Sequence, residues 1–168
     1  MTSANVILTH NQIIQKIRRI AFEIYEQNFD EAEVVFAGIV GTGYRMAQLL
    51  EEQYRQVSTM NTQLVKVTID KKAPLQTFIE LDCELESLEG KVIVMVDDVL
   101  NTGKTIAYSM KPFLNIRVSK LQVAVMVDRS YRRFPVFVDY MGYELSTTVN
   151  EHVEVQLDDE NNYQVTLT

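Results

Sequence analysis

The chain has too few cysteines and histidines for a zinc site or a disulfide framework. Its 168 residues include one cysteine, Cys83, and two histidines, His10 and His152. A Cys/His zinc site needs about four such ligands, and a disulfide framework needs several cysteine pairs. The sequence therefore excludes both classes, and we expect structural roles for the two histidines.

The chain also lacks a long apolar run and a secretory start. No stretch approaches the roughly 20 apolar residues that cross a membrane, and residues 1 to 8 lack the basic start and apolar core of a signal peptide. With 46% hydrophobic and 23% charged residues, the composition is that of a globular protein. We therefore expect one cytoplasmic domain over residues 1–168, without membrane contact.

Positive charge is scarce. The 16 lysines and arginines are outnumbered by 23 aspartates and glutamates, which gives a formal net charge of -7. This acidic balance disfavours broad binding to RNA phosphates, although RNA stays possible through local basic clusters. The candidate clusters are Arg129 with Arg132 and Arg133, and Lys71 with Lys72. Either cluster could instead be ordinary solvated surface.

The chain does contain a repeated order of strand, short turn and helix. The first helix opens with the spacing of a capping box at Thr9 and Gln12. Strands that alternate with helices predict an α/β fold with a mainly parallel twisted sheet flanked by helices, which binds ligands beyond the carboxyl ends of its strands. The predicted elements are helices at about 10–27, 44–56 and about 104–114, and strands at 33–40, 64–69, 92–96 and 121–127.

The remaining segments are less regular. Residues 75–82 are expected to include a short strand. The C-terminal third carries three further apolar segments that predict antiparallel strands or a small hood over the sheet. They are VFVDY at 136–140, HVEVQL at 152–157 and YQVTL at 163–167.

An acid pair follows one of the buried strands. Asp97 and Asp98 should stand at the carboxyl edge of that strand, where burial without partners is costly, so they favour a ligand. In the loop after them, Gly103 permits close backbone approach, and the hydroxyls of Thr102 and Thr105 can donate hydrogen bonds. Because a helix then begins and exposes unpaired N–H groups, the loop predicts a phosphate cradle, with ribose hydroxyls on the acids.

Three other interpretations of these turns compete. The letters GKT suggest a P-loop, but Asp98 stands where that motif requires its first glycine. The turn at Gly41 and Gly43 suggests a dinucleotide fingerprint, but its third glycine would fall at Met46. The acids could instead have only a structural role and cap a helix. In that case the order of strand, acid pair, glycine loop and helix would be a coincidence.

The segment VIVMVDDVLNTGKT, residues 92–105, resembles the phosphoribosyl-pyrophosphate motif of type I phosphoribosyltransferases. Beyond it, residues 126–145 and the ending VEVQLDDEN resemble the family of pyrimidine operon regulators and uracil phosphoribosyltransferases, and the likeness spans nearly the whole chain. The resemblance implies the type I phosphoribosyltransferase fold and transfer of phosphoribose from phosphoribosyl pyrophosphate to a nucleobase, with uracil as the leading acceptor. It also implies Mg2+ held mainly by the donor, without a firm direct protein ligand, and a homodimer or homotetramer.

The resemblance also implies roles for particular residues. Asp97 and Asp98 would be the catalytic acids that hold the ribose hydroxyls. The 5′-phosphate would lie against the loop of Asn101, Thr102, Gly103, Lys104 and Thr105. Pyrophosphate would bind the backbone of Gly41, Thr42 and Gly43, and the base would lie near Asp128 and Arg129.

The chain departs from these relatives in three places. Purine-salvage relatives carry an acid where this chain has Asn101, and an amide is no general base, which disfavours hypoxanthine or guanine as acceptor. The turn at 41–43 lacks the arginine usual in the regulator family, which removes a fixed cation. The stretch after Ile69 resembles a shortened form of the family's mobile loop, in which Lys71 and Lys72 either supply cations or are ordinary surface lysines.

Three functions therefore stay open. The first is a phosphoribosyltransferase of the uracil type, which these departures would make slow. The second is a regulator that binds messenger RNA under nucleotide control. The third is a sensor that binds the donor or a nucleotide without turnover.

Overall fold

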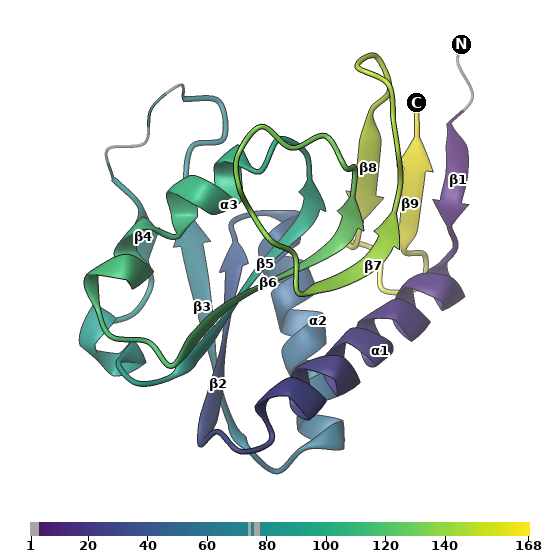
Figure 1. Cartoon of the computed structure of the whole chain (residues 1–168). Helices are drawn as coiled ribbons and strands as arrows, with labels where there is room; N and C mark the ends of the chain where they lie inside the picture. Colours follow the sequence, from purple (N-terminus) through teal and green to yellow (C-terminus); the bar gives the residue numbers. More distant parts are fainter. Residues whose placement is uncertain (1–3, 74, 76–77) are drawn as a thin grey trace.

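The computed structural model describes residues 4–73, 75 and 78–168, and its elements alternate along much of the chain (Figure 1). The helices are α1 His10–Asn28, α2 Thr42–Val57 and α3 Lys104–Ser109, with 3-10 helices η1 Leu85–Leu88 and η2 Lys111–Asn115. The strands are β1 Asn5–Leu8, β2 Glu33–Ile39, β3 Asn61–Thr68, β4 Glu80–Leu81, β5 Val92–Leu100, β6 Lys120–Asp128, β7 Tyr140–Glu144, β8 Val153–Gln156 and β9 Gln164–Leu167.

The described strands form two sheets. The larger sheet has the order β4-β3-β2-β5-β6-β7, in which β4 is antiparallel to β3 and the other pairings are parallel. The smaller sheet has the order β1-β9-β8 and is antiparallel. The predicted α/β fold with a mainly parallel sheet and a small antiparallel hood is therefore confirmed.

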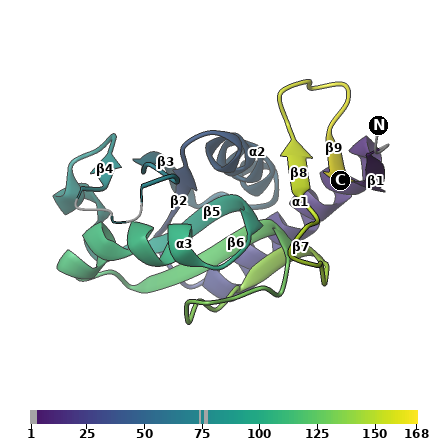
Figure 2. The ribbon, with the colours of Figure 1, turned by 90° about the horizontal axis from the view of Figure 1, so that it is seen from above.

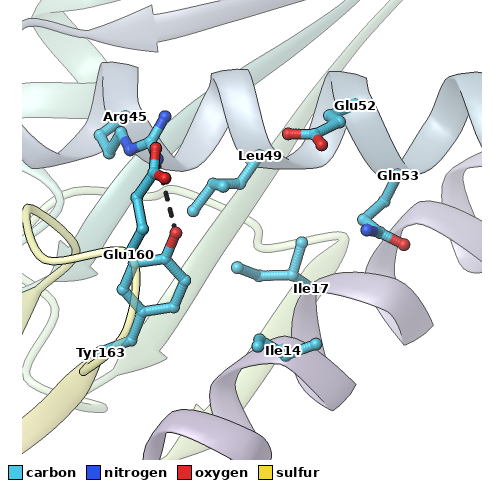
Figure 3. Close-up of a pocket in the computed structure, with 8 residues that line it drawn as sticks. All are labelled: Ile14, Ile17, Arg45, Leu49, Glu52, Gln53, Glu160 and Tyr163. Atoms are coloured by element: carbon cyan, nitrogen blue, oxygen red, sulfur yellow. Dashed lines mark hydrogen bonds and ion pairs between the residues drawn. The ribbon is translucent and has the colours of Figure 1, made fainter.

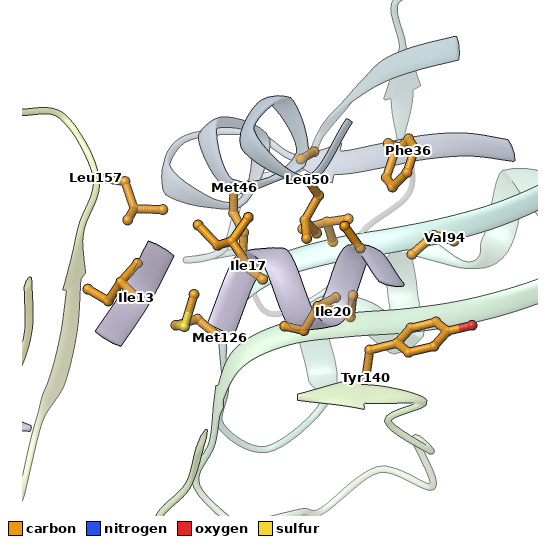
Figure 4. Packing of buried hydrophobic residues seen from close by; sticks show 14 of the residues in the cluster. Ile13, Ile17, Ile20, Phe36, Met46, Leu50, Val94, Met126, Tyr140 and Leu157 are labelled. Atoms are coloured by element: carbon orange, nitrogen blue, oxygen red, sulfur yellow. The ribbon is translucent and has the colours of Figure 1, made fainter. Parts of the chain in front are cut away.

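Each face of the larger sheet has its own apolar layer. The helices α1 and α2 cover one face, and α3 lies on the other (Figure 2). Ile13, Ile17 and Ile20 of α1 pack with Phe36 and Val94 of the sheet (Figure 4). Burial of one such isoleucine contributes about 1.5–3 kcal/mol, so this layer fixes α1 and α2 relative to the strands.

The start of α1 is as predicted. The amide of Gln12 donates to Oγ1 of Thr9 at 3.5 Å, and the amide of Thr9 donates to Oε1 of Gln12 at 2.9 Å. Both halves of the capping box are present, which satisfies N–H groups that the first turn leaves unpaired.

The middle of the sheet is a topological switch point. From β2 the chain moves to β3 on one side, whereas from β5 it moves to β6 on the other. In open α/β sheets ligands bind where the strand order reverses in this way. The pairing of β2 with β5 ends at Gly38 and Val96, while β5 stays paired with β6 as far as Leu100. The last four residues of β5 therefore have an edge that is not paired with β2.

This pairing corrects the predicted end of the strand at 92–96. Asp97 and Asp98 lie within β5 rather than after it, because β6 extends to Asp128 and supplies ladder partners to that length. The helix predicted over 104–114 is also wrong in length. It ends at Ser109 and a 3-10 helix follows, because Pro112 has no N–H for an α-helical bond.

The C-terminal predictions were correct for two of three strands. The segments at 152–157 and 163–167 contain β8 and β9. The segment 136–140 is not an antiparallel strand, because β7 begins only at Tyr140 and runs parallel to β6. Within 75–82 the strand covers Glu80–Leu81, and residues 74, 76 and 77 lie outside the described part.

Two further observations concern the ends of the chain and its helices. No strand was predicted at Asn5–Leu8, yet β1 pairs there with β9 and joins the two ends of the chain in one sheet (Figure 1). Among the described residues, no helix combines the length and apolarity needed to span a bilayer.

Candidate active site

A polar pocket of about 400 Å³ lies at the carboxyl end of β5. Its walls are the start of α2, Lys71, the last residues of β5, the loop before α3 with the first turn of α3, and residues 152–155 in and directly before β8. The predicted site residues that line it are Thr42, Asp97, Asp98, Asn101, Thr102, Gly103, Lys104 and Thr105. The switch point of the sheet therefore carries most of the residues that the sequence singled out.

The acid pair forms the floor of this pocket. The side chain of Asp97 is 2% exposed and that of Asp98 is 20% exposed. Oδ1 of Asp97 accepts hydrogen bonds from the amide of Asp98 at 2.9 Å and from Nζ of Lys71 at 3.2 Å. Burial and the neighbouring Asp98 carboxylate together raise the pKa of Asp97 to about 8, although the Lys71 ammonium lowers it. The floor is thus a buried carboxyl group with a raised pKa, and Lys71 is its cationic partner.

The first turn of α2 packs directly on the acid pair. A Cβ atom on Gly43 would stand 2.8 Å from Oδ1 of Asp97 and 3.1 Å from its Cα, so only glycine fits there. Gly41, the N-cap of α2, has φ of 93°, which glycine adopts without strain. Thr42 and Gly43 are therefore in the first helical turn rather than in a loop. The unpaired N–H groups of this turn form a site that favours an anion.

Hydrogen bonds from the segment after β6 fix the loop before α3. Gly103 has φ of 86°, and the amide of Lys104 donates to Oγ1 of Thr102 at 3.2 Å. The carbonyl oxygen of Thr102 accepts from the amides of Arg133 at 2.8 Å and Phe134 at 3.0 Å. Because these contacts fix the turn, its N–H groups and hydroxyls face the pocket in a preset shape.

Asp128 and Arg129, predicted to lie near a base, are not among the residues that line the pocket. Asp128 is 1% exposed and forms an ion pair with Arg132. Its Oδ1 accepts from the amide of Ser130 at 2.9 Å, and Ser130 has a positive φ of 55°. Arg129 donates to Oδ1 of Asn101 at 2.7 Å and to the carbonyl of Glu151 at 2.8 Å. Arg129 thus ties the loop before α3 to the segment before β8, whereas Asp128 contacts the loop that follows it, and the predicted place of both near the base stays a prediction.

Three titratable pocket residues were missed or left undecided by the sequence. His152, directly before β8, and Glu154 of β8 line the pocket, although a structural role was expected for His152. Within the described part of the chain, neither side chain has a hydrogen bond or an ion pair. Period-two burial of Val153 and Val155 puts His152 and Glu154 on one strand face, but only the tertiary position of β8 brings that face to the pocket. Lys71, left open as a surface lysine, reaches the acid pair.

A second pocket of about 270 Å³ lies between α1, α2 and the turn before β9 (Figure 3). Its apolar side is formed by Ile14, Ile17 and Leu49. On its polar side Arg45 donates to Oε1 of Glu160 at 3.2 Å and more weakly to the hydroxyl of Tyr163 at 3.4 Å. These bonds tie the C-terminal turn to α2, and the acid pair is elsewhere, so the pocket at β5 is the candidate active site.

The chain matches a known family over most of its length. The family described as phosphoribosyl transferase domain matches residues 3–160. Bifunctional protein PyrR of Bacillus pumilus is 32% identical over 168 residues, which cover 95% of this chain and 93% of that protein. The protein of the same name from Fusobacterium nucleatum is 31% identical over 159 residues, which cover 90% of each. The predicted resemblance to this family is confirmed.

Solved structures share the fold at low sequence identity. The hypoxanthine phosphoribosyltransferase of Trypanosoma cruzi has a TM-score of 0.78 and 16% identity, with 97% of this chain and 95% of that chain covered. A hypoxanthine-guanine phosphoribosyltransferase of Bacillus anthracis has a TM-score of 0.76 and 13% identity, with 96% and 97% covered. These neighbours confirm the predicted fold, and their low identity carries nothing about the base.

Proposed function

Because the chain belongs to the phosphoribosyl transferase domain family, we propose that it transfers phosphoribose from phosphoribosyl pyrophosphate to a nucleobase, with uracil as the favoured acceptor. The observation that carries this proposal is one pocket that holds both an acid pair, of which Asp97 is buried, and the loop before α3. The two features suit the opposite ends of one ribose phosphate.

Each part of the donor has a counterpart in the pocket. The ribose hydroxyls would donate to the carboxylates of Asp97 and Asp98. The 5′-phosphate would accept from the N–H groups and hydroxyls of residues 101–105, and the pyrophosphate would lie at the first turn of α2. Positioning and electrostatic stabilisation of an oxocarbenium-like sugar would supply most of the catalysis, since carboxylates stand beside the carbon that gains positive charge.

The acid pair also fits the Mg2+ that the family implies. Magnesium is usually bound through one or two carboxylates, substrate phosphates and water rather than by a cage of protein ligands. No cluster of three or more His, Cys, Asp or Glu suited to a metal occurs in the described residues. We propose that the ion is held mainly by the donor, where it would neutralise the departing pyrophosphate.

Two features support uracil as the acceptor. The relatives with the highest identities quoted above carry the name of the bifunctional PyrR proteins. Asn101 occupies the position of the acid in purine-salvage relatives, and its Oδ1 is engaged by Arg129 at 2.7 Å. An amide in that hydrogen bond cannot take a proton from a purine ring.

An assay with the donor, Mg2+ and a panel of uracil, cytosine, hypoxanthine, guanine and adenine tests the proposal. We expect pyrophosphate release and a nucleotide product with uracil, and loss of both in Asp97→Asn. Asp158→Asn, which removes the same charge from an exposed turn, serves as the control. If no base in the panel gives pyrophosphate release, the proposed transferase activity is contradicted. If only a purine gives turnover, uracil as the acceptor is contradicted.

The RNA-binding regulator is the second candidate that the resemblance offers. In the basic cluster at 129–133, Arg129 and Arg132 are committed to internal contacts, which leaves Arg133 exposed. Few phosphates could be neutralised there, so we expect weak RNA binding with a shallow salt dependence.

The homodimer or homotetramer that the resemblance implies stays a prediction. Sedimentation velocity tests it.

A further inference from the structure

Lys71 occupies the acid pair in the structure. Its Nζ atom lies 3.2 Å from Oδ1 and 3.5 Å from Oδ2 of Asp97, and 3.9 Å from Oδ1 of Asp98. Its side chain is 43% exposed, whereas the carboxylate of Asp97 is buried. The ammonium thus reaches from the surface into the floor of the pocket.

The segment that carries Lys71, residues 70–73, is called the strap below. Besides the contact of Lys71 with the acids, the strap has a second contact with the pocket, because Nζ of Lys104 donates to the carbonyl of Ala73 at 3.2 Å. Between the strap and the start of α3 only about 10 Å³ is empty, room for about one water molecule. The strap is therefore seated on the phosphate loop and on the acid pair together.

Both contacts of the strap use groups that the donor needs. If the proposed function holds, the ribose hydroxyls require the carboxylate oxygens that Lys71 now contacts. The 5′-phosphate likewise attracts the Lys104 ammonium that now binds Ala73. The donor and the strap therefore compete for the same atoms.

We propose that Lys71 is a donor-binding residue that holds the ribose position in the empty pocket and moves to the diphosphate when the donor binds. In the empty pocket the ammonium of Lys71 lies against both acids and favours their ionised form, which would be more costly without a cation. When ribose hydroxyls replace it, the ammonium loses that partner but gains the negative charge that the same ligand brings.

The chemistry of the first turn of α2 suits this movement. The turn Gly41, Thr42 and Gly43 offers N–H groups and a hydroxyl to a diphosphate but no side-chain cation. A lysine stem is flexible, and its ammonium is a compact point charge that can change partners with small backbone movement. Thr42 and Lys71 line the same pocket. The charge missing from the turn is thus available from the strap.

Two ligands that differ by the diphosphate separate this role from a structural one. Ribose 5-phosphate competes with Lys71 for the acids but offers it no diphosphate, whereas phosphoribosyl pyrophosphate with Mg2+ does both. In Lys71→Met we expect ribose 5-phosphate to bind as tightly as in the wild type or up to about threefold tighter. We expect phosphoribosyl pyrophosphate to bind about tenfold more weakly, since a charge-assisted contact is lost.

Calorimetry with both ligands measures these changes against two further variants. Lys72→Met is the matched control, because Lys72 is the adjacent lysine and is exposed; it should shift either affinity less than twofold. Lys71→Arg keeps the charge and should restore most of the donor affinity. Circular dichroism establishes that each variant is folded.

The outcomes are distinguishable. Opposite or unequal effects of Lys71→Met on the two ligands, absent in Lys72→Met, support the role of Lys71. Equal loss of both affinities, or effects that match Lys72→Met, overturn it while the proposed function stands. A wild-type protein that binds neither ligand overturns the proposed function itself.

Discussion

The guanidinium of Arg129 donates a hydrogen bond of 2.7 Å to Oδ1 of Asn101, and so joins the end of β6 to the phosphate loop. Its other nitrogen atoms donate to Oγ1 of Thr147 at 2.8 Å and to the carbonyl of Glu151 at 2.8 Å. These two residues lead into β8, which forms the opposite wall of the pocket. One side chain therefore sets the distance between the loop and that wall.

Replacing Arg129 should loosen both walls. For Arg129→Met we expect a loss of about 2 kcal/mol in the free energy of unfolding, since several hydrogen bonds from a charged donor disappear. Donor affinity should fall about tenfold because the loop loses its preset shape. Urea denaturation and calorimetry measure the two effects. Arg133→Met, at an exposed arginine nearby, is the control, and equal results for both variants would remove this role of Arg129.

The buried carboxylate of Asp97 should make stability depend on pH. Burial raises its pKa to about 8, so between the unfolded value near 4 and about 8 the folded state binds a proton that the unfolded state does not. Stability from this group is therefore present at low pH and is lost as pH rises through that window. Asp97→Asn should abolish the loss and be more stable than wild type by on the order of 2 kcal/mol at pH 9.

Thermal denaturation of Asp97→Asn and wild type between pH 5 and pH 9 measures this difference. Asp158→Asn removes an exposed carboxylate and should follow the wild-type curve. A difference between Asp97→Asn and wild type that stays constant over this range would contradict the raised pKa.

A methyl group on Gly43 should disturb the acid pair. Its Cβ would stand 2.8 Å from Oδ1 of Asp97 and 3.1 Å from the carbonyl oxygen of Val96, and backbone cannot move aside easily. Gly43→Ala should therefore weaken donor binding more than about tenfold and destabilise the fold by about 1–3 kcal/mol. Gly90→Ala is the matched control: its φ of 76° makes alanine strained, but no atom lies within 4 Å of the added Cβ. That variant should lose stability and keep donor affinity.

A change in the buried polar cluster at the end of α1 should affect the stability of the fold and leave the pocket unchanged. Asn28 is fully buried, and its Nδ2 donates to the carbonyl of Ile24 at 2.9 Å and to Oε1 of Gln122 at 3.0 Å. Asn28→Ala leaves polar groups of Gln122 and Tyr140 with fewer partners, which should cost about 2–3 kcal/mol. Donor affinity measured at a temperature where the variant is folded should not change. Gln15→Ala, at an exposed position of the same helix, should stay within about 0.5 kcal/mol of wild type.

The sequence predicts most strands and helices because the central strands are continuous apolar runs, while α1 and α2 carry buried residues at helical spacing. The capping box at Thr9 and the apolar run before Asp97 are local signals, and the structure agrees with both. The length of β5 was mispredicted because it depends on β6, a strand more than twenty residues later. Polar residues such as Asp97 end a strand in isolation, but a neighbour that extends to Asp128 keeps the ladder going.

The pocket shows the same division. Residues 97–105 are contiguous, so their chemistry is legible in one motif. His152 and Glu154 reach the pocket only because β8 lies at the end of β5, and Lys71 only because the strap turns back onto the acids. Arg129 looks like a candidate ligand by type, yet its partners at Asn101 and Glu151 are distant in sequence. The local pattern does not distinguish a role in base binding from a role in stabilising the wall of the pocket, so the place of Arg129 near the base stays a prediction.

The pairing of β1 with β9 has a consequence for the order of folding. Asn5 pairs with Leu167, so this contact closes a loop of almost the entire chain, at a large cost in chain entropy. The parallel sheet must first bring the two ends near each other, and the sheet that carries β8 should therefore form late and open first. Faster amide hydrogen exchange at Val155 than at Val94 would reveal it. The wall of the pocket that β8 forms is then a separate cooperative unit, less stable than the parallel sheet that carries the acids.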